Sequence, residues 1–176
     1  MTVKVGFLGG LGEVGRNCAS LEVDGEIALI DCGLMFPEED MLGVDLVLPD
    51  FASIIDRASD FRCIVLTHGH EDHIGALGFL LEEVNVPIYG TPLTIEFARA
   101  RIEERGIVPD LRAVEHYEWV DDGPFRFTFV PVSHSIPDAA GVAFDTPEGI
   151  VLPVSYTHLT LPTMIIRCSS RWWAGR

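Results

Sequence analysis

The alternation of apolar and polar residues predicts that the chain opens with β-strands. Residues 3–8 alternate weakly and end in glycines. The segments 18–23 and 26–31 flank Asp24-Gly25, a dipeptide that favours a tight type I′ turn. The first 31 residues are therefore expected to form a strand, a glycine-rich loop and a β-hairpin.

The middle of the chain alternates short strands with helices. Residues 63–66 form an apolar run of buried-strand type, and apolar residues at helical spacing then predict a helix from about residue 73 to residue 84. Residues 87–89 indicate a further strand. Thr91 and Pro92 supply an N-cap and a first-turn proline for a second helix, which Gly106 closes.

Strand patterns return near the end of the sequence, at residues 125–132, 141–144 and 149–152. Pro147-Glu148-Gly149 marks a turn between the last two. Hairpins combined with strand–helix units predict a layered domain of the α/β or α+β class, with helices packed on sheets. The length of 176 residues, 48% of them hydrophobic, suits one such domain with a single respectable core.

Composition excludes several kinds of protein. No stretch approaches the roughly 20 apolar residues of a membrane span, and the opening residues lack a secretory signal, so we expect a cytoplasmic protein without membrane contact. The net charge of −15 argues against a stand-alone RNA binder, because nucleic-acid affinity rests largely on Lys and Arg. The four cysteines lack C-x-x-C spacing, which predicts buried, reduced thiols.

The strongest chemical signal is the segment His68-Gly69-His70-Glu71-Asp72-His73, directly after the buried strand. On an extended segment His68 and His70 face the same side and can hold one ion, while Asp72 and His73 point toward a second position. A polar loop with hydrogen-bonded histidines is the structural alternative, but the H-x-H-x-D-H spacing favours metal. This donor set favours zinc, with manganese as a lesser possibility, and two ions sharing a water imply hydrolysis.

Two residues elsewhere are candidates for the same site. His134 stands where an apolar strand ends in a polar turn, and is a candidate ligand beside a site that needs another imidazole. Asp31 is either an ordinary strand-end carboxylate or an acceptor that fixes the tautomer of a ligand imidazole, and the sequence leaves both open. His116 and His158 lack such context and are expected to be surface or packing residues.

The run from Gly10 to Gly15 satisfies G-x-G-x-x-G and could be taken for a dinucleotide-binding turn. Such a turn opens a helix, whereas residues 16–33 have a hairpin pattern. We therefore expect a glycine-rich loop that passes near the metals.

Taken together, these segments resemble ribonuclease J over residues 1–152. The matching motifs are GGLGEVGRN, LIDCG, LTHGHEDHIGAL, and VSHSIPDAAGVAF followed by TPEGIVL. The histidine motif alone indicates the metallo-β-lactamase superfamily. The glycine loop and the HSIPD turn narrow the resemblance to its RNA-processing β-CASP branch.

The resemblance implies the first part of an αββα sandwich, two zinc ions, and hydrolysis of RNA phosphodiesters by endonucleolytic cutting and 5′-to-3′ trimming in RNA processing and decay. It implies that His68, His70 and His134 hold one zinc ion. Asp72 and His73 belong to the other and have the catalytic role, with a metal-held hydroxide attacking phosphorus, and Asp31 orients the cluster. RNA is the implied partner, and the full-length enzyme is expected to be a homo-oligomer.

The resemblance stops after Leu152. The family continues with a T-G-D-F-K type element whose aspartate bridges both metals, and Tyr156 occupies that position here. The family's final histidine ligand, its β-CASP insertion and its carboxy-terminal domain have no counterpart. All 27 acidic residues lie before residue 153, and SYTHLTLPT resembles translated adaptor sequence. We therefore divide the chain into residues 1–152, the amino-terminal part of the domain, and residues 153–176, a non-native tail.

An amino-terminal ribonuclease fragment with little or no activity of its own is the leading interpretation. The alternatives are a small-substrate metallohydrolase of the thioesterase or lactonase type, which the glycine loop and HSIPD turn disfavour, and an inert metal-binding or partner-binding module.

Overall fold

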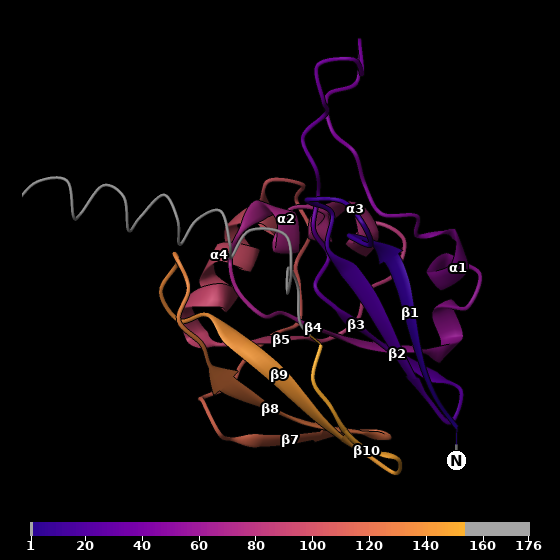
Figure 1. Cartoon of the computed structure of the whole chain (residues 1–176), viewed down its shortest axis with the longest axis vertical. Helices are drawn as coiled ribbons and strands as arrows, with labels where there is room; N and C mark the ends of the chain where they lie inside the picture. The colour runs from indigo at the N-terminus through magenta and orange to yellow at the C-terminus, as the bar shows by residue number, and fades with distance from the viewer. Residues whose placement is uncertain (1, 154–176) are drawn as a thin grey trace, which may run out of the picture.

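Two β-sheets lie face to face, and helices cover the outer side of one of them (Figure 1). The computed structural model describes residues 2–153 of the chain. The first sheet has six strands in chain order: β1 (Val3–Gly9), β2 (Cys18–Val23), β3 (Glu26–Ile30), β4 (Phe61–Val65), β5 (Ile88–Gly90) and β6 (Leu111–Ala113). The second has the order β10 (Gly149–Val151), β9 (Ala140–Thr146), β8 (Phe125–Pro131) and β7 (Trp119–Asp122).

The helices follow the strands of the first sheet. They are α1 (Ala52–Ile55), a 3-10 turn (Ala58–Asp60), α2 (Glu71–Ile74), α3 (Leu77–Leu81) and α4 (Pro92–Glu103). In the described part of the chain, α1 to α4 all lie on the side of the first sheet that faces away from the second (Figure 1). The mixed α/β sandwich predicted from the sequence is confirmed as a helix layer on two sheets.

The opening hairpin forms as predicted. β1, β2 and β3 pair antiparallel, and both residues of the turn have positive φ, 51° at Asp24 and 93° at Gly25, as a type I′ turn requires. From β3 to β6 the strands are parallel, so their carboxyl ends meet at one edge of the sheet. The loops that leave this edge carry most of the candidate site.

Two apolar layers explain why the central strands are buried on both faces. In β3, Ala28 and Ile30 face the second sheet, where they pack with the aromatic cluster of Phe127, Phe129 and Phe144. The alternate residues of β3 face the helices. Apolar residues on both faces therefore place β3 and β4 in the middle of the molecule.

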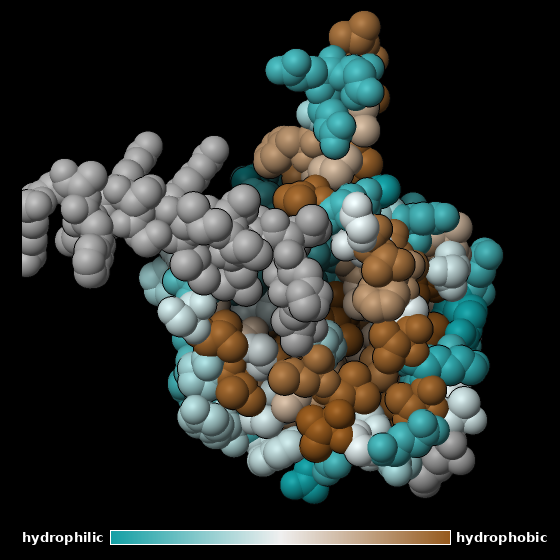
Figure 2. Space-filling view, in the orientation of Figure 1, coloured by the Kyte–Doolittle hydropathy of each residue, from teal (hydrophilic) through white to brown (hydrophobic). Residues whose placement is uncertain are grey.

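One side of the sandwich is open. Val5 and Phe7 of β1 share a face with core residues of β2, yet they are exposed by 51% and 60%, because the described part of the second sheet does not reach over them. Ile150 and Leu152, in β10 and just after it, are also exposed. Figure 2 shows apolar side chains gathered on this face of the molecule.

The position of Thr91 at the N-cap and of Pro92 in the first turn of α4 is as predicted, but the helices differ from the prediction in two details. The single helix expected at 73–84 is interrupted between α2 and α3, because the backbone N–H of Ala76 donates to the carbonyl of Cys32 at 2.9 Å. Thr91 occupies the N-cap position of α4, but its hydroxyl does not cap the helix and instead bonds Thr94 and the carbonyl of Asp138. The pattern of apolar residues does not reveal such long-range partners.

Other expectations fall partly outside residues 2–153. Cys18, Cys32 and Cys63 are buried free thiols, as predicted, whereas Cys168, His158, Tyr156 and the proposed tail from residue 154 onward lie outside the described residues. No helix in the described part is both long enough and apolar enough to span a bilayer.

Candidate metal centre

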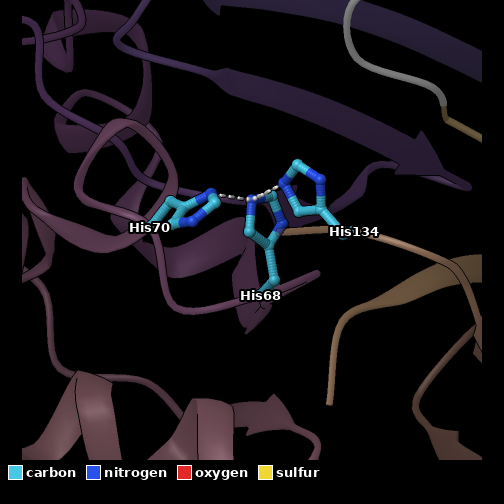
Figure 3. A group of neighbouring side chains, drawn as sticks. All are labelled: His68, His70 and His134. Atoms are coloured by element: carbon cyan, nitrogen blue, oxygen red, sulfur yellow. Dashed lines mark hydrogen bonds between the residues drawn. The ribbon is translucent and has the colours of Figure 1, made fainter. Parts of the chain in front are cut away.

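Three histidines from two distant segments converge at the edge of the first sheet (Figure 3). His68 follows β4, His70 stands at the start of α2, and His134 follows β8. The Nε2 atom of His68 lies 3.1 Å from Nδ1 of His70 and 3.1 Å from Nε2 of His134. One ring nitrogen of each residue lies within 4.8 Å of the other two.

This arrangement fits a metal ion better than mutual hydrogen bonding. A single nitrogen of His68 faces two imidazole nitrogens, and one N–H can serve only one of them. In a tetrahedral site with Zn–N bonds of 2.0–2.1 Å, ligand nitrogens lie about 3.3 Å apart, close to the two distances of 3.1 Å from His68. The histidine cluster therefore indicates a metal ion.

The protonation of the cluster also suits metal binding. Burial, reinforced by the neighbouring His73, lowers the pKa of His68 to about 4. Burial and the nearby imidazole of His70 lower the pKa of His134. Both side chains are therefore neutral at pH 7, which is the form that binds metal.

Asp72 and His73 form a second group beside the three histidines. Both lie in α2, where Nε2 of His73 is 3.6 Å from Oδ2 of Asp72 and the His73 ring is 4.0 Å from the His68 ring. The structure thus places these two residues next to the cluster without making them part of it.

Asn17 joins this second group, a role that the sequence analysis missed. Its side-chain amide donates to the backbone carbonyl of Asp72 at 3.0 Å and to Oδ2 of Asp72 at 3.2 Å, and it lies 3.2 Å from Nε2 of His73. Its position at the end of the glycine-rich loop was the available signal, since that loop was expected near the metals.

Asp31 connects the three-histidine cluster with the group formed by Asp72 and His73. It follows β3 with a φ of 61°, and its Oδ2 lies 2.7 Å from Nδ1 of His73. Its Oδ1 accepts from the backbone N–H of Thr67 at 2.8 Å, and the Thr67 hydroxyl also contacts Nδ1 of His68 at 2.9 Å. Of the two interpretations left open by the sequence, the geometry supports an acceptor that fixes an imidazole.

The charge of Asp31 sets the protonation of its partner. Burial alone disfavours a charged imidazole at His73, but the adjacent Asp31 carboxylate outweighs it and raises the pKa of His73. Hydrogen bonding through Nδ1 directs Nε2 of His73 toward Asp72.

Backbone hydrogen bonds lock the metal-site segments together. The N–H of Cys32 donates to the carbonyl of His73 at 2.7 Å, and the N–H of Asn17 donates to the carbonyl of Asp72 at 2.9 Å. Gly33 must lack a side chain, because a Cβ at this position would overlap the Asp72 carbonyl. The LIDCG motif is therefore a packing surface for α2.

The glycine-rich loop has no dinucleotide-binding geometry. Residues 10–17 form an irregular loop that leads into β2, and no helix follows it. The positive φ of Gly10, Gly12 and Gly15, 79°, 76° and 107°, explains the glycines. As expected from the sequence, the loop passes beside the site and delivers Asn17 to it.

His116 lies outside the cluster. Its Nε2 is 3.7 Å from Oδ1 of Asp138, and its side chain is partly buried, in agreement with a packing role.

Among protein families, the metallo-beta-lactamase superfamily matches residues 11–169 of the chain. Among curated proteins, Ribonuclease J 1 of Streptococcus pyogenes is 40% identical over 152 residues, which cover 85% of this chain and 27% of that protein. Ribonuclease J of Corynebacterium glutamicum is 41% identical over 151 residues, covering 85% and 21%. The chain thus spans about a quarter of the length of these relatives.

Solved structures with the same fold include a protein of unknown function from Enterococcus faecalis, with a TM-score of 0.66 at 18% identity over 86% of this chain and 43% of that chain. The Rm3 metallo-beta-lactamase gives a TM-score of 0.60 at 18% identity over 89% and 62%. At these identities the likeness shows the fold alone.

Proposed function

The chain belongs to the metallo-beta-lactamase superfamily, and on that premise we propose that it is the amino-terminal part of a zinc-dependent ribonuclease acting on RNA phosphodiesters. The observation that carries the proposal is the convergence of His68, His70 and His134 in a chain about 40% identical to ribonucleases J over 85% of its length. Because the chain spans about a quarter of those proteins, catalysis is proposed for the longer protein.

Each site residue has a distinct proposed part. His68, His70 and His134 hold one zinc ion, and Asp72 and His73 supply ligands at the second position and the catalytic role. Asp31 holds the imidazole of His73 through Nδ1 and, with Thr67, orients that of His68. Bound zinc supplies Lewis acidity, which activates water and polarises the phosphodiester. Manganese is the alternative metal, and elemental analysis of the purified protein distinguishes it from zinc.

The remaining parts of the proposal concern the longer protein. RNA is its substrate in endonucleolytic and 5′-to-3′ exonucleolytic cleavage, and the protein is a cytoplasmic homo-oligomer. We also propose that the domain part ends after Leu152 and that residues 153–176 are foreign to the gene. On this proposal the 176-residue chain has little or no hydrolytic activity.

A chimera tests the function directly. Residues 1–152 replace the matching segment of the Streptococcus pyogenes ribonuclease, which is 40% identical over that length. The expected result is cleavage of 5′-labelled RNA, abolished by His68→Ala and retained by His116→Ala, a histidine outside the cluster. A folded, metal-loaded chimera that leaves RNA intact but hydrolyses a thioester or lactone would replace the proposal with a small-substrate hydrolase. Failure on all three substrates would indicate an inert module.

A further inference from the structure

The loop that carries His134 has little local support. Residues 132–139 connect β8 to β9, and residues 131–135 are all exposed. In the described structure, residues 133–136 lie outside any helix or strand, and Pro137 and Asp138 form a turn. The loop is closed at its base, where Val132 N–H donates to Ala139 and Ala140 N–H donates to Thr67, both at 3.0 Å. The position of His134 therefore depends on contacts that the loop makes with other segments of the chain.

Asp138 makes such contacts, and two of them reach the start of α4, while its Oδ1 also lies 3.7 Å from Nε2 of His116. Its Oδ2 accepts the backbone N–H of Leu93 at 3.0 Å, and its own carbonyl accepts the hydroxyl of Thr91 at 2.8 Å. The side chain of Thr91 does not cap α4, so the Asp138 carboxylate caps it from a distant segment. A negative charge at a helix N-terminus is favourable.

The same helix also supports the other two histidines. Arg101 of α4 donates through Nε to Oε1 of Glu71 at 2.6 Å, and Glu71 lies next to His70. Phe97 of α4 lies so close to Gly69 that a Cβ there would overlap its ring. Helix α4 is therefore a common platform that contacts the HGHED segment on one side and the His134 loop on the other.

We propose that Asp138 is a positioning residue of the metal centre: its carboxylate, bound to the first turn of α4, holds the 132–139 loop so that His134 faces His68. This inference rests on the proposed metal centre. It also accounts for the φ of 62° at Asp138, which turns the chain so that carbonyl and carboxylate both meet α4.

Two substitutions separate the carboxylate from the backbone shape. Asp138→Gly keeps the positive φ and removes the carboxylate, whereas Asp138→Asn keeps an acceptor oxygen and tolerates the same φ. Asp24→Gly is the matched control, because Asp24 has a φ of 51° and accepts the Thr2 N–H at 3.2 Å. Asp24 precedes β3, so it lies at the end of the strand opposite the metal centre.

The 176-residue chain is titrated with zinc against a chromophoric chelator, and its cobalt complex is followed by visible absorption. Asp138→Gly is expected to lower zinc affinity about tenfold or more and to alter the cobalt spectrum, as loss of an imidazole requires. Asp138→Asn and Asp24→Gly keep the wild-type affinity and spectrum.

Unchanged zinc affinity in Asp138→Gly, or an equal loss in Asp24→Gly, would overturn the role of Asp138 while leaving the metal centre intact. Wild-type protein that binds no zinc would overturn both. If Asp138→Gly shows no cooperative melting, Thr91→Val replaces it, since this variant removes the hydroxyl bound to the Asp138 carbonyl. The expected result is then a smaller loss of zinc affinity, and no loss refutes the proposal.

Discussion

Nδ1 of His73 lies 2.7 Å from Oδ2 of Asp31, and both side chains are almost completely buried. A carboxylate in this position fixes the imidazole ring and its tautomer, which are the two properties that a metal ligand requires. The contact joins residues 42 positions apart and brings the end of β3 to the start of α2.

Asp31→Asn is therefore expected to lower zinc affinity by about 10- to 100-fold, because the amide cannot accept from both His73 and Thr67 as the carboxylate does. Asparagine tolerates the φ of 61° at this position, so backbone strain does not explain the loss. Chelator competition measures the effect. Asp24→Asn, in the hairpin turn, serves as control, and equal affinities of Asp31→Asn and wild type would refute the role of Asp31.

Gly33→Ala tests the packing of the LIDCG motif against α2. A Cβ at residue 33 overlaps the backbone carbonyl of Asp72, which cannot move without displacing the site, so we expect a loss of about 3 kcal/mol or more in the free energy of unfolding. Gly141→Ala is the control, since its Cβ meets only ordinary contacts at 3.7 Å. That change should be neutral or stabilising by about 0.5–1 kcal/mol. Urea denaturation measures the free energy of unfolding of both variants. Similar values for Gly33→Ala and Gly141→Ala would contradict the expected overlap.

The sequence predicted the candidate metal ligands better than the residues that hold them in place. The H-x-H-x-D-H spacing and the strand-end position of His134 identified residues that the fold brings together, because donor type and residue spacing can be read directly from the sequence. Asn17 and Thr67 escaped notice, since their contacts depend on how separate loops pack. The interruption between α2 and α3 was missed for the same reason: the N–H of Ala76 bonds Cys32, a partner that no helical pattern contains.

The fold was predictable where apolar patterning was strong. The hairpin at Asp24-Gly25 and the buried strands followed from composition and period, whereas the three-residue β6 and the four-residue β7 were not predicted. Such short strands carry too few alternating residues to stand out, and they form because neighbouring strands provide hydrogen-bonding partners.

The metal-free chain should lose stability as the pH falls from about 6.5 toward 4. His68 has a pKa of about 4 in the folded state, below the ordinary value of about 6.5 that it has in the unfolded chain. Its contribution to the free energy of unfolding is therefore fully present above pH 6.5. It is lost as the pH falls toward 4, because protons bind the unfolded chain more readily than the folded one. His73, whose pKa is raised, contributes in the opposite direction. Urea denaturation of wild type and His68→Gln across this range isolates the His68 contribution. A stability difference between the two that does not shrink toward low pH would contradict the prediction.

Zinc content of the purified 176-residue chain, measured by elemental analysis beside His70→Ala and His116→Ala, tests the central claim most directly. The structure predicts about one firmly bound zinc ion in wild type and in His116→Ala, and none in His70→Ala, because His70 belongs to the three-histidine cluster whereas His116 does not. Folded wild-type protein without zinc, or zinc that persists in His70→Ala, would contradict the claim that these three histidines form a metal site.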